Sequence, residues 1–177
     1  MTNSEETRVL FTGKFLEVKK QGRWEYVHRN SASGAAVIVA ITDERQIILV
    51  EQYRIPVGQR VIELPAGLVG DDAGGKGEAN ATAARRELLE ETGFAARELT
   101  QVAHGPPSAG LASEIVTFFV ARGLTREHDG GGDEHEQITV HLVPIAEADA
   151  WLTSQERERG VLVDPKVYAG LYFATRG

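Results

Sequence analysis

Three glutamates near the end of one predicted helix are the first residues whose spacing indicates chemistry. The segment 86–94 reads Arg-Glu-Leu-Leu-Glu-Glu-Thr-Gly-Phe. Its Arg, Leu and Glu residues favour a helix, and Gly93 is a natural C-terminal stop. Glu87 and Glu91 then share one face, where two like charges cost about 0.2–0.5 kcal/mol. Both also lie in a last turn that disfavours anions, so we expect these carboxylates to hold a cation.

Mg²⁺ or Mn²⁺ is the cation that this pattern favours. A hard divalent ion takes oxygen ligands, keeps several waters and is usually held by one or two carboxylates plus substrate phosphates. Glu87, Glu90 and Glu91 supply three carboxylates close together. The alternative is a solvated helix face with an internal pair between Arg86 and Glu90, and composition alone does not decide between the two.

The order of these residues resembles the Nudix box, Gly-x5-Glu-x7-Arg-Glu-U-x-Glu-Glu-x-Gly-U with U apolar, which is the signature of the Nudix hydrolase family. Every position from Glu78 to Phe94 matches it. The first glycine departs, because strict spacing places it at Asp72. Either it is lost, or Gly67 serves and the loop 70–77 carries extra residues. The resemblance implies an α/β fold, the Nudix α/β/α sandwich with a mixed sheet.

The resemblance also implies roles for the box residues. The glutamates Glu87, Glu90 and Glu91 would hold Mg²⁺ or Mn²⁺ together with the backbone carbonyl of Ala66. Arg86 would orient the glutamates through charge-assisted hydrogen bonds. Arg86 and Glu90 are therefore also expected among the catalytic residues.

Composition limits the classes of function. A chain of 177 residues with 42% hydrophobic and 25% charged residues suits one soluble domain with a small appendage. We expect an N-terminal β unit over residues 1–32, which would serve as a dimerisation element, and a hydrolase domain over 33–177. The net charge of −7 argues against a nucleic-acid partner. No apolar run suggests a membrane span, and the polar first residues predict a cytoplasmic location.

Periodicity predicts short strands separated by turns, with helices after the box. The N-terminal unit should be a small antiparallel meander. The apolar run 35–41 predicts a strand that is buried on both faces. The predicted strands are 9–11, 15–18, 24–27, 35–41, 46–52, 61–64, 101–104, 115–120 and 138–143, and the predicted later helices are 147–159 and 165–173.

Trp24 and Tyr26 point to the same face of the N-terminal unit, where they are either core residues or a platform for stacking a base. Such a small unit is marginal alone and must pack on the main domain or on a second copy of the chain. In the ADP-ribose pyrophosphatase branch of the family, this unit packs across a two-fold interface, so the resemblance implies a homodimer.

The segments 51–54 and 63–67 resemble those that precede the box in the ADP-ribose pyrophosphatase branch. That resemblance implies that Arg54 and Glu63 bind the substrate. The alternative for Arg54 is a surface ion pair with Glu51. In the loop 105–110, Ser108 is a further substrate-binding candidate.

Ala109 stands where the branch has proline, which predicts relaxed selection at the terminal sugar. The acidic, glycine-rich loop 129–136 lies where the branch places its general base. Glu134 matches that residue best and Glu136 is the second choice, and the alternative is a solvated linker.

The implied activity is Mg²⁺-dependent hydrolysis of the diphosphate linkage of ADP-ribose, giving AMP and ribose 5-phosphate, or of related nucleoside diphosphate sugars. Two alternatives remain: a nucleotide-binding sensor or regulator without catalysis, and a pyrophosphatase for dinucleotides or coenzyme A. The intact box glutamates favour an enzyme.

Overall fold

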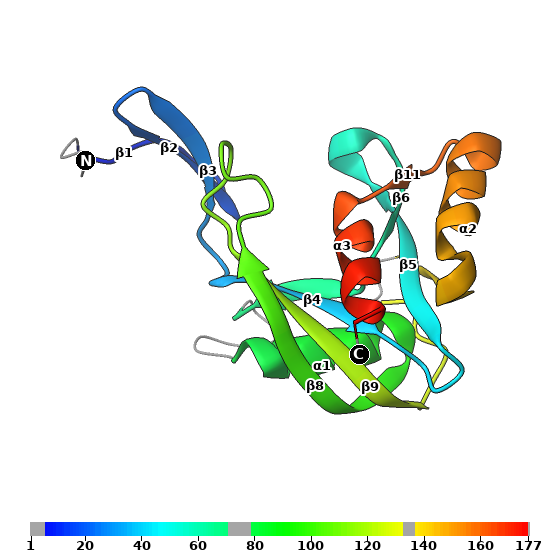
Figure 1. Ribbon diagram of the computed structural model, residues 1–177. Coiled ribbons are helices and arrows are strands. Elements are labelled where there is room, and N and C mark those ends of the chain that lie inside the picture. Colours follow the sequence, from blue (N-terminus) through cyan, green and yellow to red (C-terminus); the bar gives the residue numbers. More distant parts are fainter. Residues whose placement is uncertain (1–5, 71–78, 133–136, 177) are drawn as a thin grey trace.

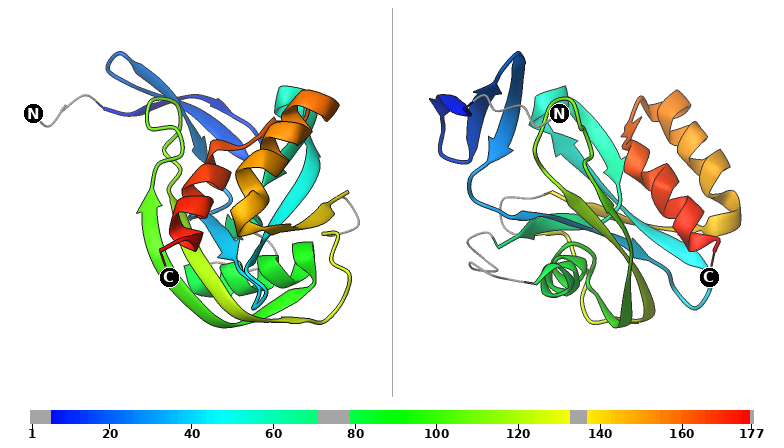
Figure 2. Two further views of the ribbon diagram at one scale, coloured as in Figure 1. Left: turned by 45° about the vertical axis from the view of Figure 1, so that its right-hand side comes forward. Right: turned by 60° about the vertical axis from the view of Figure 1, so that its left-hand side comes forward.

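The computed structural model describes residues 6–70, 79–132 and 137–176. Its strands form three sheets, and its helices lie on two sides of the larger pair (Figures 1 and 2). The strands are β1 (Arg8–Thr12), β2 (Leu16–Gln21), β3 (Trp24–Arg29), β4 (Gly34–Ala40), β5 (Gln46–Arg54), β6 (Gln59–Glu63), β7 (Ala66–Val69), β8 (Phe94–Gly105), β9 (Val116–Arg126), β10 (Thr139–Pro144) and β11 (Leu162–Val163). The helical segments are η1 (Ile55–Val57), α1 (Asn80–Thr92), η2 (Ile145–Glu147), α2 (Ala148–Ser154), η3 (Gln155–Arg159) and α3 (Pro165–Ala174).

The predicted N-terminal β unit is confirmed as an antiparallel sheet in the order β1-β2-β3. It projects from the body of the molecule, and its inner end lies beside the loop that follows β8 (Figure 1). Val27 makes the junction, because its N–H donates to Leu111 O at 2.8 Å and its carbonyl accepts from the N–H of Ser113 at 3.0 Å. These backbone bonds fix the base of the sheet to the main domain.

The main domain has two four-stranded mixed sheets, in the orders β7-β4-β9-β8 and β10-β5-β6-β11. The first is mixed because β4 runs parallel to β9 and antiparallel to β7, and the second because β11 runs parallel to β6. Helix α1 lies on one side, with α2 and α3 on the other (Figure 2). The predicted α/β/α layering is therefore confirmed, with two sheets in place of the single sheet expected.

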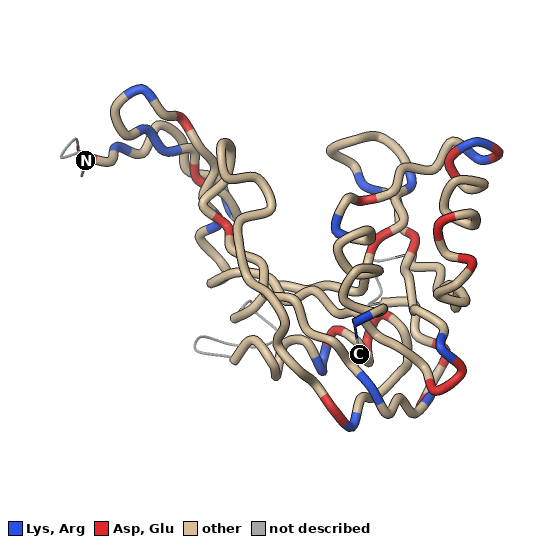
Figure 3. The backbone as a smooth tube through the Cα atoms, in the orientation of Figure 1, with Lys and Arg blue, Asp and Glu red and all other residues tan. Residues whose placement is uncertain are grey.

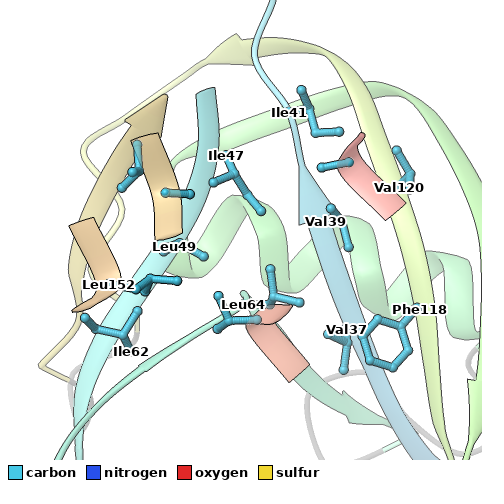
Figure 4. Close-up of a cluster of buried hydrophobic side chains, with 14 of the residues drawn as sticks. Val37, Val39, Ile41, Ile47, Leu49, Ile62, Leu64, Phe118, Val120 and Leu152 are labelled. Atoms are coloured by element: carbon cyan, nitrogen blue, oxygen red, sulfur yellow. The ribbon is translucent and has the colours of Figure 1, made fainter. Parts of the chain in front are cut away.

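Strand β4 divides the core into two clusters. Val37, Val39 and Ile41 face a cluster shared with β5, β6, α2 and α3 (Figure 4). The alternate residues, such as Ile38, face α1 in the second cluster. Burial of each such side chain is worth about 1.5–3 kcal/mol, so both faces of β4 contribute. The period-two alternation also fixes its register, since a slip of one residue would exchange the two faces.

Strands β8 and β9 show the largest extensions beyond their predicted ranges. Strand β8 begins at Phe94, directly after the box helix, and β9 continues to Arg126. They pair over their whole length. The added parts contain exposed charged residues such as Glu98, which carry no apolar signal. Strand β7, over Ala66–Val69, was not among the predicted strands.

The predicted helix boundaries are largely confirmed. Helix α1 ends at Thr92, and Gly93 adopts a left-handed φ of 76°. The helix expected over 147–159 is α2 followed by the π-helical turn η3, which Gly160 ends. Asp164 caps α3, and its side chain accepts the N–H of Lys166 at 2.7 Å. None of the helices in the described ranges has the length and apolar character needed to cross a membrane.

Candidate active site

A cavity of about 490 Å³ opens where the two larger sheets meet the carboxyl half of α1 and the start of α3. Residues of β3, β4, β5, β6, β7 and β9 line it, together with residues of the loop after β8. Charged side chains from distant parts of the chain line it. They are Arg29, Arg54, Glu63, Glu87, Glu91, Glu114 and Lys166.

Helix α1 brings two of the predicted metal ligands to this cavity. Its Ala83, Ala84 and Leu88 are fully buried against the sheet, which fixes the rotation of the helix. Glu87 and Glu91 follow one another on the face that looks into the cavity. Glu91 is only 3% exposed, so the fold has accepted a considerable desolvation cost to place this carboxylate.

The start of β7, at Ala66 and Gly67, fits closely around these glutamates. The N–H of Ala66 donates to Glu91 Oε2 at 3.0 Å. A Cβ atom at Gly67 would lie 1.8 Å from Glu87 Cδ, so only glycine allows the Glu87 carboxylate to rest on this backbone. The proposed ligand Ala66 therefore lies directly beside Glu87 and Glu91.

Arg86 connects the glutamates of the box. Its Nη1 donates to Glu87 Oε1 at 2.8 Å and to Glu90 Oε2 at 3.1 Å, and its Nη2 donates to Leu68 O at 3.3 Å. The Arg86–Glu90 pair is expected both for a solvated helix face and for a metal site, so it does not distinguish them. The contact with Glu87 is the one that the orienting role requires. Glu90 itself is half exposed, with 51% of its side chain accessible, and does not line the cavity.

The oxygen atoms at this end of the cavity suit a hard divalent ion. In the described ranges 6–70, 79–132 and 137–176, no group of three His, Asp or Glu side chains converges tightly enough to hold an ion unaided. Mg²⁺ commonly takes one or two carboxylates and completes its shell with waters and substrate phosphates. Glu87 and Glu91, with the neighbouring backbone of Ala66, meet that requirement.

Arg54 and Glu63 face the same cavity from the second sheet. Arg54 Nε donates to Glu63 Oε2 at 2.6 Å. The alternative pair of Arg54 with Glu51 is wrong, because Glu51 lies in a different cluster. The structure thus brings both predicted substrate-binding residues to the cavity that contains Glu87 and Glu91.

The Glu51 cluster is the second charged centre of the molecule. Glu51 is 1% exposed and contacts Arg60 at 2.6 Å, Arg159 at 2.8 Å and His141 at 3.0 Å. Burial alone raises the pKa of Glu51, but the hydrogen bonds from Arg159, Arg60 and His141 outweigh that effect and lower the pKa to about 2. This carboxylate is ionised and fully paired, which indicates a structural role.

Trp24 and Ser108 lie apart from the main cavity of their own chain. Trp24 is 53% exposed, so its interpretation as a core residue is wrong for the single chain. It lines a second cavity of about 360 Å³ with Tyr26, Ala109 and Ser113. Ser108 is a loop residue whose carbonyl accepts the N–H groups of Leu111 and Ala112, and among the described lining residues it belongs to neither cavity.

Four cavity residues were missed by sequence reasoning. Arg29 and Glu114, which pair at 2.9 Å, are 85 positions apart, and no local pattern joins them. Lys166 follows the Asp164-Pro165 start of α3 directly, so the helix cap was an available signal. Pro107 lines the main cavity, whereas the resemblance placed the position of the expected proline at Ala109.

The candidate bases Glu134 and Glu136, together with Glu78, lie outside the described residues. The described chain does show where the preceding segment runs. The N–H of Gly131 donates to Glu91 O at 2.8 Å, and the N–H of Gly132 donates to Glu90 O at 3.1 Å. The chain therefore contacts the end of the box helix one residue before position 133.

Comparison with known proteins places this geometry in context. A family model described as NUDIX domain matches residues 32–165. In the solved structure described as an ADP compounds hydrolase, the similarity covers 97% of this chain and 90% of that chain, with a TM-score of 0.71 and 24% identity. At that identity the likeness shows the fold alone.

Curated relatives carry several different names. The methanol dehydrogenase activator of Bacillus methanolicus is 37% identical over 65% of this chain, and the ADP-ribose pyrophosphatase of Bacillus subtilis is 39% identical over 70%. The matches span 60% and 64% of those two proteins. The GDP-mannose pyrophosphatase of Enterobacter sp. (strain 638) is 32% identical over 84% of this chain and 78% of its own length.

Proposed function

This chain belongs to the Nudix family, and we propose that it hydrolyses the diphosphate linkage of ADP-ribose or of a related nucleoside diphosphate sugar with Mg²⁺ or Mn²⁺. The observation that carries the proposal is the sharing of one cavity by two groups. Glu87 and Glu91 face it from α1, and the Arg54–Glu63 pair faces it from the second sheet. The relatives named for ADP-ribose and GDP-mannose support this class of substrate.

In the proposed reaction, the oxygen of water bonds to one phosphorus and the bridging P–O bond breaks. ADP-ribose then gives AMP and ribose 5-phosphate. A divalent ion, when bound, neutralises charge on the diphosphate and acidifies water. Glu87 and Glu91 would hold that ion, and the N–H of Ala66 keeps the Glu91 carboxylate in place.

The remaining roles fall to residues around the cavity. Arg86 orients Glu87 through their 2.8 Å contact. Arg54 would bind an anionic part of the substrate, because its charge faces the cavity and Glu63 fixes its position. Glu134, or Glu136 as the second choice, would take the proton of the attacking water on a carboxylate oxygen.

A homodimer is part of the same proposal. The N-terminal sheet exposes large apolar side chains: Val9 is 52% exposed, Phe11 61%, Phe15 53% and Trp24 53%. Such a patch marks an interaction surface. Residues 8–29 hold six Lys or Arg and two Glu, a net charge of +4 in a chain of net charge −7 (Figure 3). The positive charge of the sheet complements the acidic remainder of a second copy, and its exposed apolar side chains would be buried by the contact.

Light scattering at micromolar concentration tests the dimer. Phe11→Ser is the disrupting variant, and Leu162→Ser is a matched control at an exposed leucine outside the N-terminal sheet. We expect a dimer for the wild type and the control. A fully active wild-type monomer would contradict the proposal.

The cytoplasmic location expected from the sequence stays a prediction.

A nucleotide-binding regulator is the competing function, and the relative named as an activator favours keeping it in the test. The deciding experiment is a screen with Mg²⁺ of ADP-ribose, ADP-glucose, GDP-mannose, dinucleotides and coenzyme A, with products identified by chromatography. We expect AMP and ribose 5-phosphate from ADP-ribose. Binding of these nucleotides without any product would favour the regulator.

A further inference from the structure

The carboxyl end of α1 is closed by a segment that lies more than thirty positions further along the chain. The last four carbonyls of a helix have no partner within it. Here Leu89 O accepts the N–H of Gly93 at 2.8 Å, while Glu91 O and Glu90 O accept the N–H groups of Gly131 and Gly132. The turn that carries two box glutamates is thus capped by residues from outside the box.

This contact depends on two glycines whose backbones touch. A Cβ atom at Gly130 would lie 2.5 Å from Thr92 C and 2.7 Å from Glu91 O. A Cβ atom at Gly93 would lie 2.0 Å from His128 O. Both residues also have positive φ, 72° and 76°. Any side chain at Gly130 must therefore push the capping segment away from the turn that holds Glu91.

The capping segment, residues 126–132, is itself fixed by side chains. His128 Nδ1 accepts the N–H of Gly130 at 3.0 Å. Arg126 donates to His128 O at 3.3 Å and pairs with Asp129 at 3.1 Å. The guanidinium of Arg126 also lies over the ring of Phe94, 5.8 Å from its centroid. The segment therefore has a defined shape that it can impose on the helix end.

We propose that Gly130 is a positioning residue for metal binding, because it lets the capping segment hold the backbone of Glu90 and Glu91. The Glu91 carboxylate is fixed at its tip by the N–H of Ala66 and at its base by this cap. Residues that orient metal ligands from outside change affinity about 10–100-fold when altered. The inference rests on the proposed function only for the use of a divalent ion.

The cap also relates two parts of the proposed chemistry. In the sequence, Gly132 stands two positions before Glu134, the candidate base. The same backbone bonds that hold the metal-binding turn therefore set the starting point of the segment with the base. Loss of the cap should affect kcat more than KM. The proposed substrate-binding pair Arg54 and Glu63 lies on β5 and β6, and not on the capped end of α1.

The test compares Gly130→Ala with Gly160→Ala. Gly160 also ends a helical segment with positive φ, 64°, but a Cβ atom there meets nothing within 4 Å. The two variants share the backbone strain, and only the first has the collision. We expect Gly130→Ala to bind Mn²⁺ about tenfold or more weakly by calorimetry or electron paramagnetic resonance. Gly160→Ala should bind Mn²⁺ as the wild type does.

Equal Mn²⁺ affinity of Gly130→Ala and the wild type would overturn the inference. If Gly130→Ala does not fold, His128→Ala removes the acceptor for the Gly130 N–H, and His128→Asn restores an acceptor oxygen. We then expect several-fold weaker Mn²⁺ binding in His128→Ala and recovery in His128→Asn. Unchanged Mn²⁺ binding in His128→Ala would overturn the inference in that case.

The Mn²⁺ titrations use no substrate, so they separate this inference from the proposed activity. Weaker Mn²⁺ binding by Gly130→Ala, in a protein that hydrolyses none of the tested nucleotides, would leave the inference standing and remove the proposed activity. Hydrolysis by the wild type with full Mn²⁺ affinity in the variants would do the reverse. A wild type that binds no Mn²⁺ at millimolar concentration would overturn the inference itself.

Discussion

Glu51 and Glu91 are both buried glutamates, 1% and 3% exposed, but their surroundings differ. Glu51 contacts two arginines and a histidine. Glu91 accepts the N–H of Ala66 and shares its helix turn with Glu87 and Glu90. The first site gathers two arginines and a histidine around one carboxylate, whereas at the second one arginine, Arg86, contacts both Glu87 and Glu90.

The difference separates a charge with a structural role from the proposed metal-binding charge of Glu91. A buried carboxylate matched by cations stabilises only the arrangement that pairs it. A turn with several carboxylates is less stable by itself and gains when a cation binds. Removing the negative charge should therefore have opposite consequences at the two sites, on stability at Glu51 and on metal binding and turnover at Glu91.

Glu91→Gln should give the largest effect of the comparison. The amide keeps the size of the side chain and an acceptor for the Ala66 N–H, so the thermal midpoint should change little. The lost charge should lower kcat by on the order of 10³, the upper range for removing one group that stabilises transition-state charge. Steady-state kinetics against Mg²⁺ concentration measures this. Full activity of the variant, or of the wild type in excess chelator, would end the metal hypothesis.

Glu51→Gln should reverse that pattern. Loss of one partner from a buried ion pair costs about 3–5 kcal/mol, and we expect the lower end because Arg60 and Arg159 reach solvent. The folded fraction should keep its kcat. Urea unfolding beside kinetics measures both quantities, with Glu98→Gln, an exposed glutamate paired with Arg97, as a control. A stable but inactive variant would contradict the structural role of Glu51.

The same cluster predicts a pH dependence. The pKa of Glu51 is lowered from 4.5 to about 2 in the folded protein. Its contribution to stability is therefore complete above pH 4.5 and is lost as the pH falls toward 2, about 1.4 kcal/mol for each unit of the shift. The wild type should lose stability faster than Glu51→Gln over this range. If the free energy of unfolding falls equally in the two proteins from pH 5 to pH 2.5, the assignment of this pH dependence to Glu51 is wrong.

Glu134, the candidate general base, is a third glutamate whose role can be tested by removing its charge. If it is the base, Glu134→Gln should lower kcat by about 10²–10⁴ with little effect on KM. We expect a value near the lower limit, because a bound metal also acidifies water. Glu136→Gln is the matched control and should have a smaller effect. The reverse ranking would move the role two residues along the chain.

The parts of the structure that could be predicted depend on local patterns. Gly93 ends α1 and Asp164 caps α3, because caps and stops are written in neighbouring residues. The apolar run of β4 was recognised because both of its faces are buried. The length of β8 was missed, since its pairing with β9 is set by partners and not by its own polar composition.

Contacts between distant residues escaped sequence reasoning for the same reason. Glu51 and Arg159 are 108 positions apart, and the nearer Arg54 was the only partner that a local pattern offered. Arg54 and Glu63 lie on the same face of the β5–β6 pair, because the register sets Arg54 opposite Gln59 and Glu63 opposite Val50, and their side chains meet at 2.6 Å. The register of sheets and the packing of loops decide such pairs, and neither is legible from residue spacing alone.

Substrate selection should show the smallest effect, because it depends on loop residues beside the cavity and not on the glutamates of α1 that are proposed to hold the ion. Ala109 lacks the expected proline and lines the second cavity beside Trp24, whereas Pro107 lines the main cavity. We expect ADP-ribose to be preferred only several-fold over ADP-glucose and GDP-mannose, as measured by ratios of kcat/KM. Pro107→Ala, which frees φ at the main cavity, should change these ratios more than Ala109→Pro.

A preference for ADP-ribose above about a thousandfold would show that the missing proline at Ala109 has no bearing on selection. The absence of any ADP-ribose cleavage would remove the assignment to that branch of the family. Between these limits, the two variants locate the sugar. If only Pro107→Ala changes the ratios, the sugar lies in the main cavity of the same chain. If only Ala109→Pro changes them, the sugar contacts the second cavity beside Trp24, where the proposed dimer would bring a second copy of the chain.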